Sequence, residues 1–348
     1  MSGRARGARP ATARRRSHRV ATVLALAVLL GAAWLAFDAP GTGSRLVVAV
    51  GSHAAAPSAA LGSAGPPGPT RAASAWSSGV AGSRVAPAAT AAGACTATQG
   101  TVAEHSFWSR VADAALPYQI YLPACYASAD RRYPLLVLLP GSDGTDREWI
   151  DSLGLVDVLD TEIAAGDLPA MIVALPPSGG LANVDDLDSG RSWDTVIVDE
   201  LLPTLDAHFC TLEGAAWRAI GGDSRGGFWA VEIALQHAGL FGAVGGHSAW
   251  FTPDAQGTWE EPLTMAQTAP LAPATRFWLD AGPADPALPG ILQLAATLAA
   301  RGVDPGLHAY PSGQHDTAYW SAHVPAYLGF YAATWMDAEM PDLSCAPS

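Results

Sequence analysis

The chain has 348 residues, with 19 basic and 32 acidic side chains, and its formal net charge at pH 7 is −13. Residues 1–94 hold ten arginines and one aspartate, a net charge of +9, whereas residues 95–348 hold nine arginines and 31 acidic residues, a net charge of −22. A strongly acidic surface repels polyanions, which excludes nucleic acid and anionic lipid as partners of residues 95–348.

The N-terminus has the pattern of an export signal or a membrane anchor. Residues 1–19 carry seven arginines and no acidic residue, and residues 20–37 form an apolar run of 18 without a charge. The run is long for a signal peptide, and Pro40 after Ala39 makes a poor cleavage site. The sequence favours an uncleaved signal-anchor, with residues 1–19 cytoplasmic and the rest extracytoplasmic, over a cleaved signal peptide and a secreted chain.

Residues 38–94 differ in composition from the rest of the chain. They are rich in Ala, Gly, Ser and Pro and contain few large apolar residues that could form a core. Such composition predicts a disordered tether. Residues 95–348 are enough for one large hydrophobic core, so we expect them to form a single domain.

Apolar runs and helix-like segments alternate along residues 95–348. We expect strands at 135–139, 171–175, 217–220, 243–246, 276–279 and 307–310, and helices at 153–165, 194–209, 228–237, 291–301 and 321–335. This alternation predicts an α/β fold with a mostly parallel central sheet flanked by helices. Residues 101–110 and 118–122 are expected to form an antiparallel hairpin at the sheet edge.

A G-x-S-x-G motif, Gly222–Gly226, lies between an expected strand and an expected helix. In that context the serine is placed on a sharp, strained turn at the end of the strand, and the glycines avoid collisions with neighbouring backbone. Ser224 is therefore the candidate nucleophile. A serine hydroxyl needs a histidine base, and the histidine needs a carboxylate that orients it.

The candidate acid and base follow later strands. Asp285 comes just beyond the end of the strand at 276–279, and His315 lies on the loop after the strand at 307–310. Loop placement at the carboxyl ends of parallel strands is typical of functional residues. Asp280 is the alternative acid, but it lies nearer the strand interior, where a buried carboxylate is usually a structural hydrogen-bond acceptor. His247, His308 and His323 are the other histidines considered as bases.

An oxyanion hole needs two N–H donors, because negative charge develops on the carbonyl oxygen in the transition state. One donor is expected to be the amide of Arg225, the residue after the nucleophile. The second is expected on the loop that follows residues 135–139. We assign it to Ser142, with Gly141 as the alternative.

These motifs together resemble the Putative esterase family of the α/β-hydrolases, which includes esterase D, feruloyl, acetylxylan and enterochelin esterases, and mycolyltransferases. The resemblance runs from about 106 to 335 and is carried by Tyr121-Leu122-Pro123, Ala219–Gly227, Gly246-His247-Ser248, Asp280–Asp285 and Gly313-Gln314-His315 with Tyr319-Trp320. It implies an α/β-hydrolase fold, with Ser224 as nucleophile, Asp285 as acid and His315 as base.

The chain departs from the family pattern in two places. Pro140-Gly141 stands where the family commonly has His-Gly, and Asp223 stands where it has a small or apolar residue. A carboxylate at position 223 disfavours an anionic transition state if it faces the site, and has no effect if it faces solvent.

Four tryptophans are candidates for a substrate pocket or for the core: Trp193, Trp250, Trp259 and Trp320. Trp320 accompanies His315 in the family motif and is assigned to substrate binding. The sequence thus predicts an extracytoplasmic serine esterase that acts on a small-molecule, carbohydrate or lipid ester. An acyltransferase of the cell envelope and a catalytically silent binding module on the same fold are the alternatives.

The four cysteines predict two disulfide bonds in an exported domain. Their spacing leaves three pairings open; Cys95 with Cys125 or Cys210 is favoured, and Cys345 is expected to tie down the C-terminal tail. The cysteines match no zinc motif, and no metal or cofactor is predicted. Residues 183–188 resemble a fragment of a calcium loop but lack its glycine and terminal glutamate, which favours a solvated loop.

Overall fold

The computed structural model describes residues 95–142, 144–178, 185–186, 191–251, 261–336, 338–341 and 343–345. The expected n-region at 1–19, signal-anchor at 20–37 and tether at 38–94 lie outside the described residues, as do Trp259 and most of the calcium-like segment. Within the described ranges, no helix combines the length and apolar character that a membrane crossing needs.

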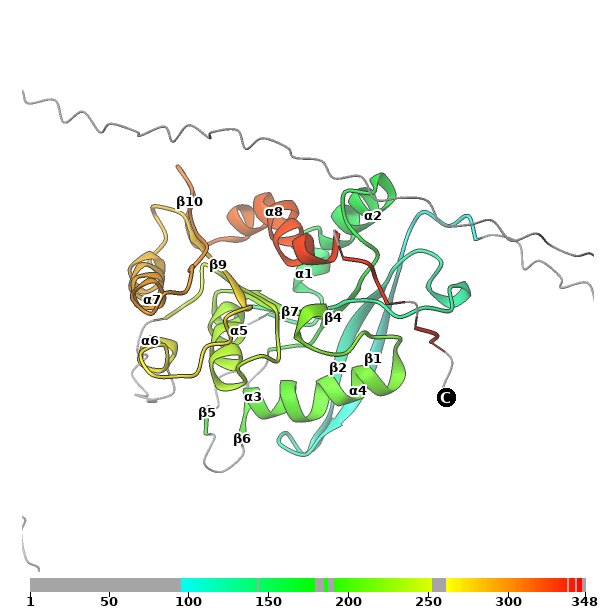
Figure 1. Cartoon of the computed structure of the whole chain (residues 1–348), viewed down its shortest axis with the longest axis horizontal. Helices are drawn as coiled ribbons and strands as arrows, with labels where there is room; N and C mark the ends of the chain where they lie inside the picture. The colour runs from blue at the N-terminus through cyan, green and yellow to red at the C-terminus, as the bar shows by residue number, and fades with distance from the viewer. Residues whose placement is uncertain are drawn as a thin grey trace, which may run out of the picture. The chain divides into compact units, whose positions relative to one another are not determined.

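A mixed sheet of eight strands, in the order β1-β2-β4-β3-β7-β8-β9-β10, forms the centre of the domain (Figure 1). The parallel strands are β3 (Leu135–Leu139), β4 (Ile172–Leu175), β7 (Arg218–Asp223), β8 (Ala243–His247), β9 (Arg276–Ala281) and β10 (Leu307–Ala309). All six expected strands are present, with ends that differ by a few residues. β3 and β4 are buried at every position, as expected of strands covered on both faces.

The expected edge hairpin is also present. β1 (Thr101–Ser109) and β2 (Ala114–Leu122) pair in antiparallel fashion, and β2 pairs with β4 antiparallel as well. The hairpin therefore extends the parallel sheet on one side and leaves β1 as its edge strand, on which Trp108 is 63% exposed. A short separate pair is formed by β5 (Asp185–Asp186) and β6 (Arg191–Ser192).

Helices cover both faces of the sheet, and each face has its own hydrophobic cluster. One face carries α1 (Glu148–Asp151), α2 (Leu155–Ala165) and α8 (Thr317–Met336) (Figure 1). The opposite face carries α3 (Trp193–Thr195), α4 (Leu202–His208), α5 (Arg225–Gln236), α6 (Pro262–Met265) and α7 (Leu288–Ala300). This arrangement of one sheet between two helical layers confirms the expected α/β class.

The expected helices are present with ends that differ from the observed ones by up to four residues, and two of the differences have clear local reasons. The helix expected at 194–209 is divided, because a π-helical turn at Val196–Leu201 separates α3 from α4. The last helix begins four residues before the expected position 321, where the Asp316 carboxylate accepts the Tyr319 N–H at 2.9 Å. An acidic side chain in this position satisfies an N–H group of the first turn and marks the helix start.

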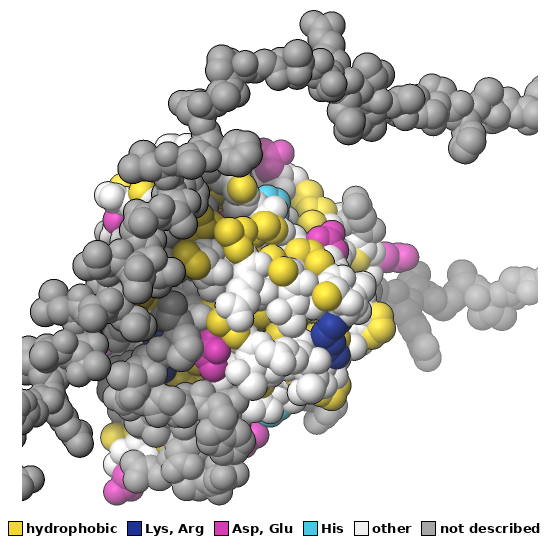
Figure 2. Space-filling model, turned by 90° about the vertical axis from the view of Figure 1, so that its left-hand side faces the viewer, with side chains coloured by type: hydrophobic (Ala, Val, Ile, Leu, Met, Phe, Trp, Pro, Cys, Tyr) yellow, Lys and Arg dark blue, Asp and Glu magenta, His cyan; other side chains and the backbone are white. Residues whose placement is uncertain are grey.

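Two disulfides join distant parts of the domain, between Cys95 and Cys125 and between Cys210 and Cys345. This is one of the pairings left open by the sequence, and it confirms that Cys345 ties down the C-terminal tail. The face of the domain that carries α7 and β10 shows hydrophobic side chains interspersed with polar or backbone surface and a few charged side chains (Figure 2). Leu292 of α7 and Leu307 of β10 are 45% and 39% exposed there.

Candidate active site

The turn between β7 and α5 holds Ser224 in a backbone conformation that few non-glycine residues adopt, with φ 50° and ψ −114°. The Ser224 amide donates to the carbonyl oxygen of His247 at 2.9 Å, which fixes the turn against β8. A Cβ at Gly222 would lie 2.5 Å from the carbonyl oxygen of Leu139 and from the backbone of Gly226. The strained turn expected from the G-x-S-x-G motif is therefore present, and its glycine is needed for close packing.

Ser224, His315 and Asp285 form a continuous chain of hydrogen bonds. The Ser224 hydroxyl lies 2.9 Å from Nε2 of His315, and Nδ1 of the same ring lies 2.9 Å from Oδ1 of Asp285. An imidazole protonated on Nδ1 donates to Asp285 and accepts from Ser224. The three residues follow β7, β10 and β9, so the carboxyl ends of neighbouring parallel strands bring them together, as expected.

The environment of Asp285 keeps its carboxylate ionised. Burial by itself raises the pKa of Asp285, but hydrogen bonds from His315, from Ser248 and from the amide of Ala287 outweigh burial and hold the pKa below its usual value. The Ala287 N–H donates at 2.7 Å. An ionised carboxylate with a fixed orientation can hold the imidazole in one tautomer and stabilise an imidazolium.

Two tryptophans approach the His315 ring edge-on. Trp250 and Trp320 have ring centroids 5.4 and 5.1 Å from that of His315. Trp320 is only 8% exposed, so most of its surface packs inside the domain rather than facing a ligand. Trp193 is 1% exposed and belongs to the core cluster beneath the sheet, which settles its role as a core residue.

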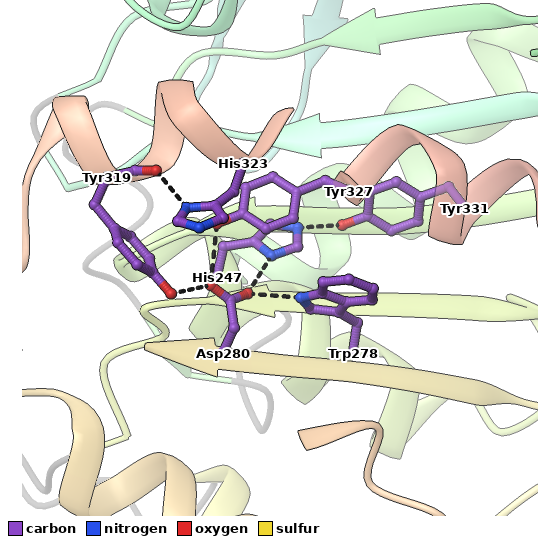
Figure 3. Close-up of polar contacts among 7 residues, drawn as sticks. All are labelled: His247, Trp278, Asp280, Tyr319, His323, Tyr327 and Tyr331. Atoms are coloured by element: carbon purple, nitrogen blue, oxygen red, sulfur yellow. Dashed lines mark hydrogen bonds and ion pairs between the residues drawn. The ribbon is translucent and has the colours of Figure 1, made fainter. Parts of the chain in front are cut away.

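Asp280 has a different environment from Asp285, in a fully buried polar network between the sheet and α8 (Figure 3). Its Oδ1 accepts from Nδ1 of His247 at 2.8 Å and from the Trp278 indole at 2.9 Å. Its Oδ2 accepts from the hydroxyls of Tyr319 and Tyr327 at 2.7 and 3.0 Å. Asp280 is thus a structural acceptor, as expected from its position in the strand.

His247 is the centre of the same network. Its Nε2 accepts from the Tyr331 hydroxyl at 2.7 Å, and its ring stacks on Tyr327 with centroids 3.5 Å apart (Figure 3). Burial first, and then the negative charge of Asp280, raises the pKa of both tyrosines well above the usual value, so both hydroxyls remain donors. Because the His247 carbonyl holds Ser224, this network supports the turn that carries the serine. In the sequence, only the family motif Gly246-His247-Ser248 and its place at a strand end marked this histidine, and its supporting role was not predicted.

Comparisons with known proteins identify the family and the fold of this chain. The model of the Putative esterase family matches residues 109–331. The chain belongs to this family. The esterase Rv1288 of Mycobacterium tuberculosis is 35% identical over 136 residues, which make up 37% of this chain and 28% of the relative. A xylanase/feruloyl esterase of Xylanibacter ruminicola is 29% identical over 155 residues, 42% of this chain and 21% of the relative. The chain thus spans less than a third of the length of these relatives.

Solved esterases have the same fold as this esterase-family chain. A ferulic acid esterase has a TM-score of 0.62 and 23% identity, over 68% of this chain and 99% of that one. An S-formylglutathione hydrolase of Staphylococcus aureus has a TM-score of 0.56 and 16% identity, over 68% and 98%. These similarities confirm the α/β-hydrolase fold.

The loop after β3 is held by contacts with Ser178 and Glu148. Ser178 is 3% exposed, and its hydroxyl donates to the carbonyl oxygens of Ser142 and Gly144 at 2.9 and 3.1 Å. The Gly141 amide donates to Oε1 of Glu148 at 3.4 Å. Sequence reasoning missed both Ser178 and Glu148, since neither belongs to a motif.

The expectation for Asp223 needs correction. We expected its carboxylate to face either the site or solvent, but it is 0% exposed and lies behind the loop, against Glu148. The alternation of side chains along β7 directs it to the same face of the sheet as Gly221, which is covered by α8.

Proposed function

We propose that this chain is a serine hydrolase that cleaves carboxylic esters through an acyl-enzyme. The observation that carries the proposal is the unbroken hydrogen-bonded chain from Ser224 through His315 to Asp285, with both links at 2.9 Å. Membership of the Putative esterase family supports the same conclusion.

In the proposed reaction, Ser224 Oγ attacks the ester carbonyl while His315 Nε2 takes the hydroxyl proton. The tetrahedral intermediate collapses to an acyl-enzyme, and the imidazolium gives its proton to the departing alkoxide. Water then attacks the acyl-enzyme by the same route, with His315 as base, and Ser224 is restored as the acid product leaves. Asp285 remains ionised throughout and stabilises the imidazolium.

We assign the oxyanion hole to the amides of Arg225 and Ser142. Arg225 is the first residue of α5, where the backbone N–H groups point out of the helix end toward a negative charge. The Gly141 amide already donates to Glu148, which favours Ser142 over Gly141 as the second donor. Two such donors act on the charge that develops in the transition state.

The proposed substrates are esters of an aromatic or other small acyl group, on a small molecule or a carbohydrate. Two observations support this class: Trp250, which is only partly buried, lies edge-on to the His315 ring, and several solved proteins of the same fold are ferulic acid esterases, one of them bound to ferulic acid. A lipid ester remains part of the substrate screen. We further propose that the domain works outside the cytoplasm, because residues 1–37 have the pattern of a signal-anchor.

The purified protein should hydrolyse acetyl, butyryl or feruloyl esters and should react with a fluorophosphonate probe. Ser224→Ala should abolish both activities, because no acyl-enzyme forms without the hydroxyl. Ser128→Ala is a suitable control, since this exposed serine lies outside the site and its hydroxyl donates to the Cys125 carbonyl, at 3.0 Å. Turnover that survives in Ser224→Ala would reject the nucleophile. Acyl transfer to an added sugar in place of hydrolysis would reassign the chain as an acyltransferase.

A further inference from the structure

Asp223 is a fully buried acidic residue immediately before the proposed nucleophile, and the reaction outlined above gives it no part. It is the last residue of β7 and is 0% exposed. A buried carboxylate without a compensating partner is strongly unfavourable, so its surroundings must explain why it is tolerated.

Both carboxylate oxygens of Asp223 are buried without a hydrogen-bond donor among the described residues. The Glu148 carboxyl group, on the first residue of α1, acts on Asp223 by its charge and by a side-chain contact that becomes a hydrogen bond only when a proton lies between the two groups. The same Glu148 side chain accepts the Gly141 amide at 3.4 Å. A Cβ built on Gly141 would lie 3.1 Å from Asp223 Oδ2, 3.7 Å from Glu148 Oε1 and 3.8 Å from the Ser224 Cβ. Both carboxyl groups therefore lie directly against the backbone of the oxyanion loop, next to the nucleophile.

Glycine is also required on the other side of Glu148. A Cβ on Gly144 would lie 3.0 Å from the Glu148 Cδ and closer still to its Oε2. The loop that begins at Gly141 is thus folded around this carboxyl group, and the Gly144 amide closes the turn by donating to the Gly141 carbonyl at 3.0 Å.

A hydrogen bond between two carboxyl groups needs a proton, because an ionised carboxylate is only an acceptor. Burial first, and then the negative charge and hydrogen bond of Glu148, raises the pKa of Asp223 well above its usual value. A proton shared by two carboxyl groups is a property of the pair rather than of either residue. Hydrogen bonds between an acid and its carboxylate are short and strong.

We propose that Asp223 and Glu148 share one proton and act together as positioning residues, holding the Gly141–Ser142 backbone in the geometry of the oxyanion hole through the Gly141 amide. This inference rests on the proposed ester hydrolysis. The pair touches neither substrate nor reacting atoms; it acts through the loop.

The shared proton also sets the charge beside the oxyanion. With it, the pair carries one negative charge; without it, two charges repel each other and the developing oxyanion. Among the described residues, the titratable groups on this side include Tyr331 of α8 and His247 of β8, which are hydrogen-bonded to each other at 2.7 Å. Asp280 of β9 lies behind them, bonded to His247 at 2.8 Å. The Arg225 guanidinium of α5 packs over the Phe228 ring, 4.3 Å from its centroid. Loss of the proton at alkaline pH is therefore expected to disturb the loop and lower kcat.

The test compares four variants in steady-state kinetics and active-site titration with a fluorophosphonate. Glu148→Ala removes the acceptor of the Gly141 amide, and kcat should fall about 10- to 100-fold with KM changed less than about threefold, approaching the loss of one oxyanion donor. Glu148→Gln and Asp223→Asn each replace the shared proton by an amide N–H, and both should stay within about threefold of wild type at neutral pH. Asp151→Asn is the matched control, an exposed carboxylate on the same helix.

The pH profile separates positioning from a merely structural role. Wild-type kcat should fall about tenfold at alkaline pH as the pair takes its second charge, whereas Asp223→Asn and Glu148→Gln should lack this fall and keep the acid limb set by the histidine base. Infrared difference spectra provide a readout independent of activity: the spectrum of wild type minus that of Asp223→Asn should show a protonated carboxyl band at neutral pH, because the contribution of Glu261, whose pKa burial raises to about 7, is the same in both proteins and cancels.

Each result counts for or against the pair. An alkaline limb that is unchanged in both amide variants, wild-type kcat in Glu148→Ala, or absence of the protonated carboxyl band from the difference spectrum would overturn the inference. Wild-type protein that neither hydrolyses esters nor reacts with the fluorophosphonate would instead reject the proposed function, while the infrared comparison still decides whether the proton is shared.

Discussion

Asp280 and Asp285, on β9 and the loop that follows it, each accept a hydrogen bond from Nδ1 of a histidine, at 2.8 and 2.9 Å. The other ring nitrogen of the histidine beside Asp280 is hydrogen-bonded to a tyrosine hydroxyl, whereas that of the histidine beside Asp285 is hydrogen-bonded to a serine hydroxyl. Asp280 is enclosed by aromatic side chains, and its histidine is 0% exposed, compared with 21% for the His315 side chain. The two aspartate–histidine pairs therefore have different consequences when they are broken.

Asp285→Asn is expected to reduce kcat about 10⁴-fold, because an amide cannot hold the imidazole in the required tautomer or stabilise its cation. Asp280→Asn is expected to lower the melting temperature, because the buried acceptor of two tyrosines, a histidine and an indole is replaced by a group that is partly a donor. Kinetics and thermal melts on the same two variants decide the matter. The reverse pattern would move the acid to Asp280.

Asp223→Asn should change how stability depends on pH. The folded-state pKa of Asp223 is raised above its ordinary value of 3.8, so folding takes up a proton. The stabilisation of the folded state by the proton on Asp223 is fully present below about pH 4 and is lost as the pH rises through the folded-state pKa of the pair. From about pH 4 upward, the melting temperature of the Asn variant should therefore increase relative to that of wild type. Parallel melting curves across this range would contradict the raised pKa.

The glycine at 245 should tolerate no larger residue while Tyr331 is present. A Cβ there would collide with the Tyr331 hydroxyl, which donates a hydrogen bond to His247. Gly245→Ala should cost about 2 to 4 kcal/mol of unfolding free energy, as overpacking in a core commonly does. Adding Tyr331→Phe should recover part of that loss, since the hydroxyl is removed. Denaturant unfolding of the single and double variants measures the coupling, and strictly additive losses would contradict the collision.

The disulfide between Cys210 and Cys345 should contribute more to stability than the one between Cys95 and Cys125. The sequence separations are 135 and 30 residues, so the first bond restricts the unfolded chain more. Replacing Cys210 and Cys345 by alanine should cost about 1 kcal/mol more than replacing the other pair. Denaturant unfolding under oxidising conditions tests this, and the same protein under reducing conditions is the control. An equal or reversed order would show that strain or residual structure dominates.

Full-length protein is expected in the membrane fraction and should resist extraction with high salt, since residues 20–37 are apolar and residues 1–19 are basic. If the 57 residues at 38–94 form the tether expected from their composition, a flexible chain of that length would have a root-mean-square reach of about 40 Å, and protease on intact cells should release the active domain. A variant lacking residues 20–37 should lose the membrane association. Active protein in the medium with a new N-terminus just after residue 39 would show a cleaved signal peptide instead.

Much of this domain is readable from the sequence because the relevant forces act locally. β3 is a continuous apolar run, and the G-x-S-x-G turn needs its serine and glycines within five adjacent positions. Asp285 and His315 were placed by their positions after strand ends, since parallel strands bring their carboxyl ends to one edge of the sheet. Helix limits were less accurate where one side chain decided them, as Asp316 does for α8.

What only the tertiary structure decided are the contacts between residues far apart in sequence. The pairing of Cys210 with Cys345 and of His247 with Asp280 and Tyr331 depends on strand register and on how α8 packs against the sheet. The same holds for Glu148, whose carboxyl group acts on Asp223 only because α1 packs against the sheet, where the Trp149 indole donates to the Leu139 carbonyl of β3 at 3.2 Å. Local propensity and hydrophobic pattern determine which residues form strands, turns and loops. Which buried polar groups become partners is set by packing, because each such group must find a donor or acceptor inside the folded chain.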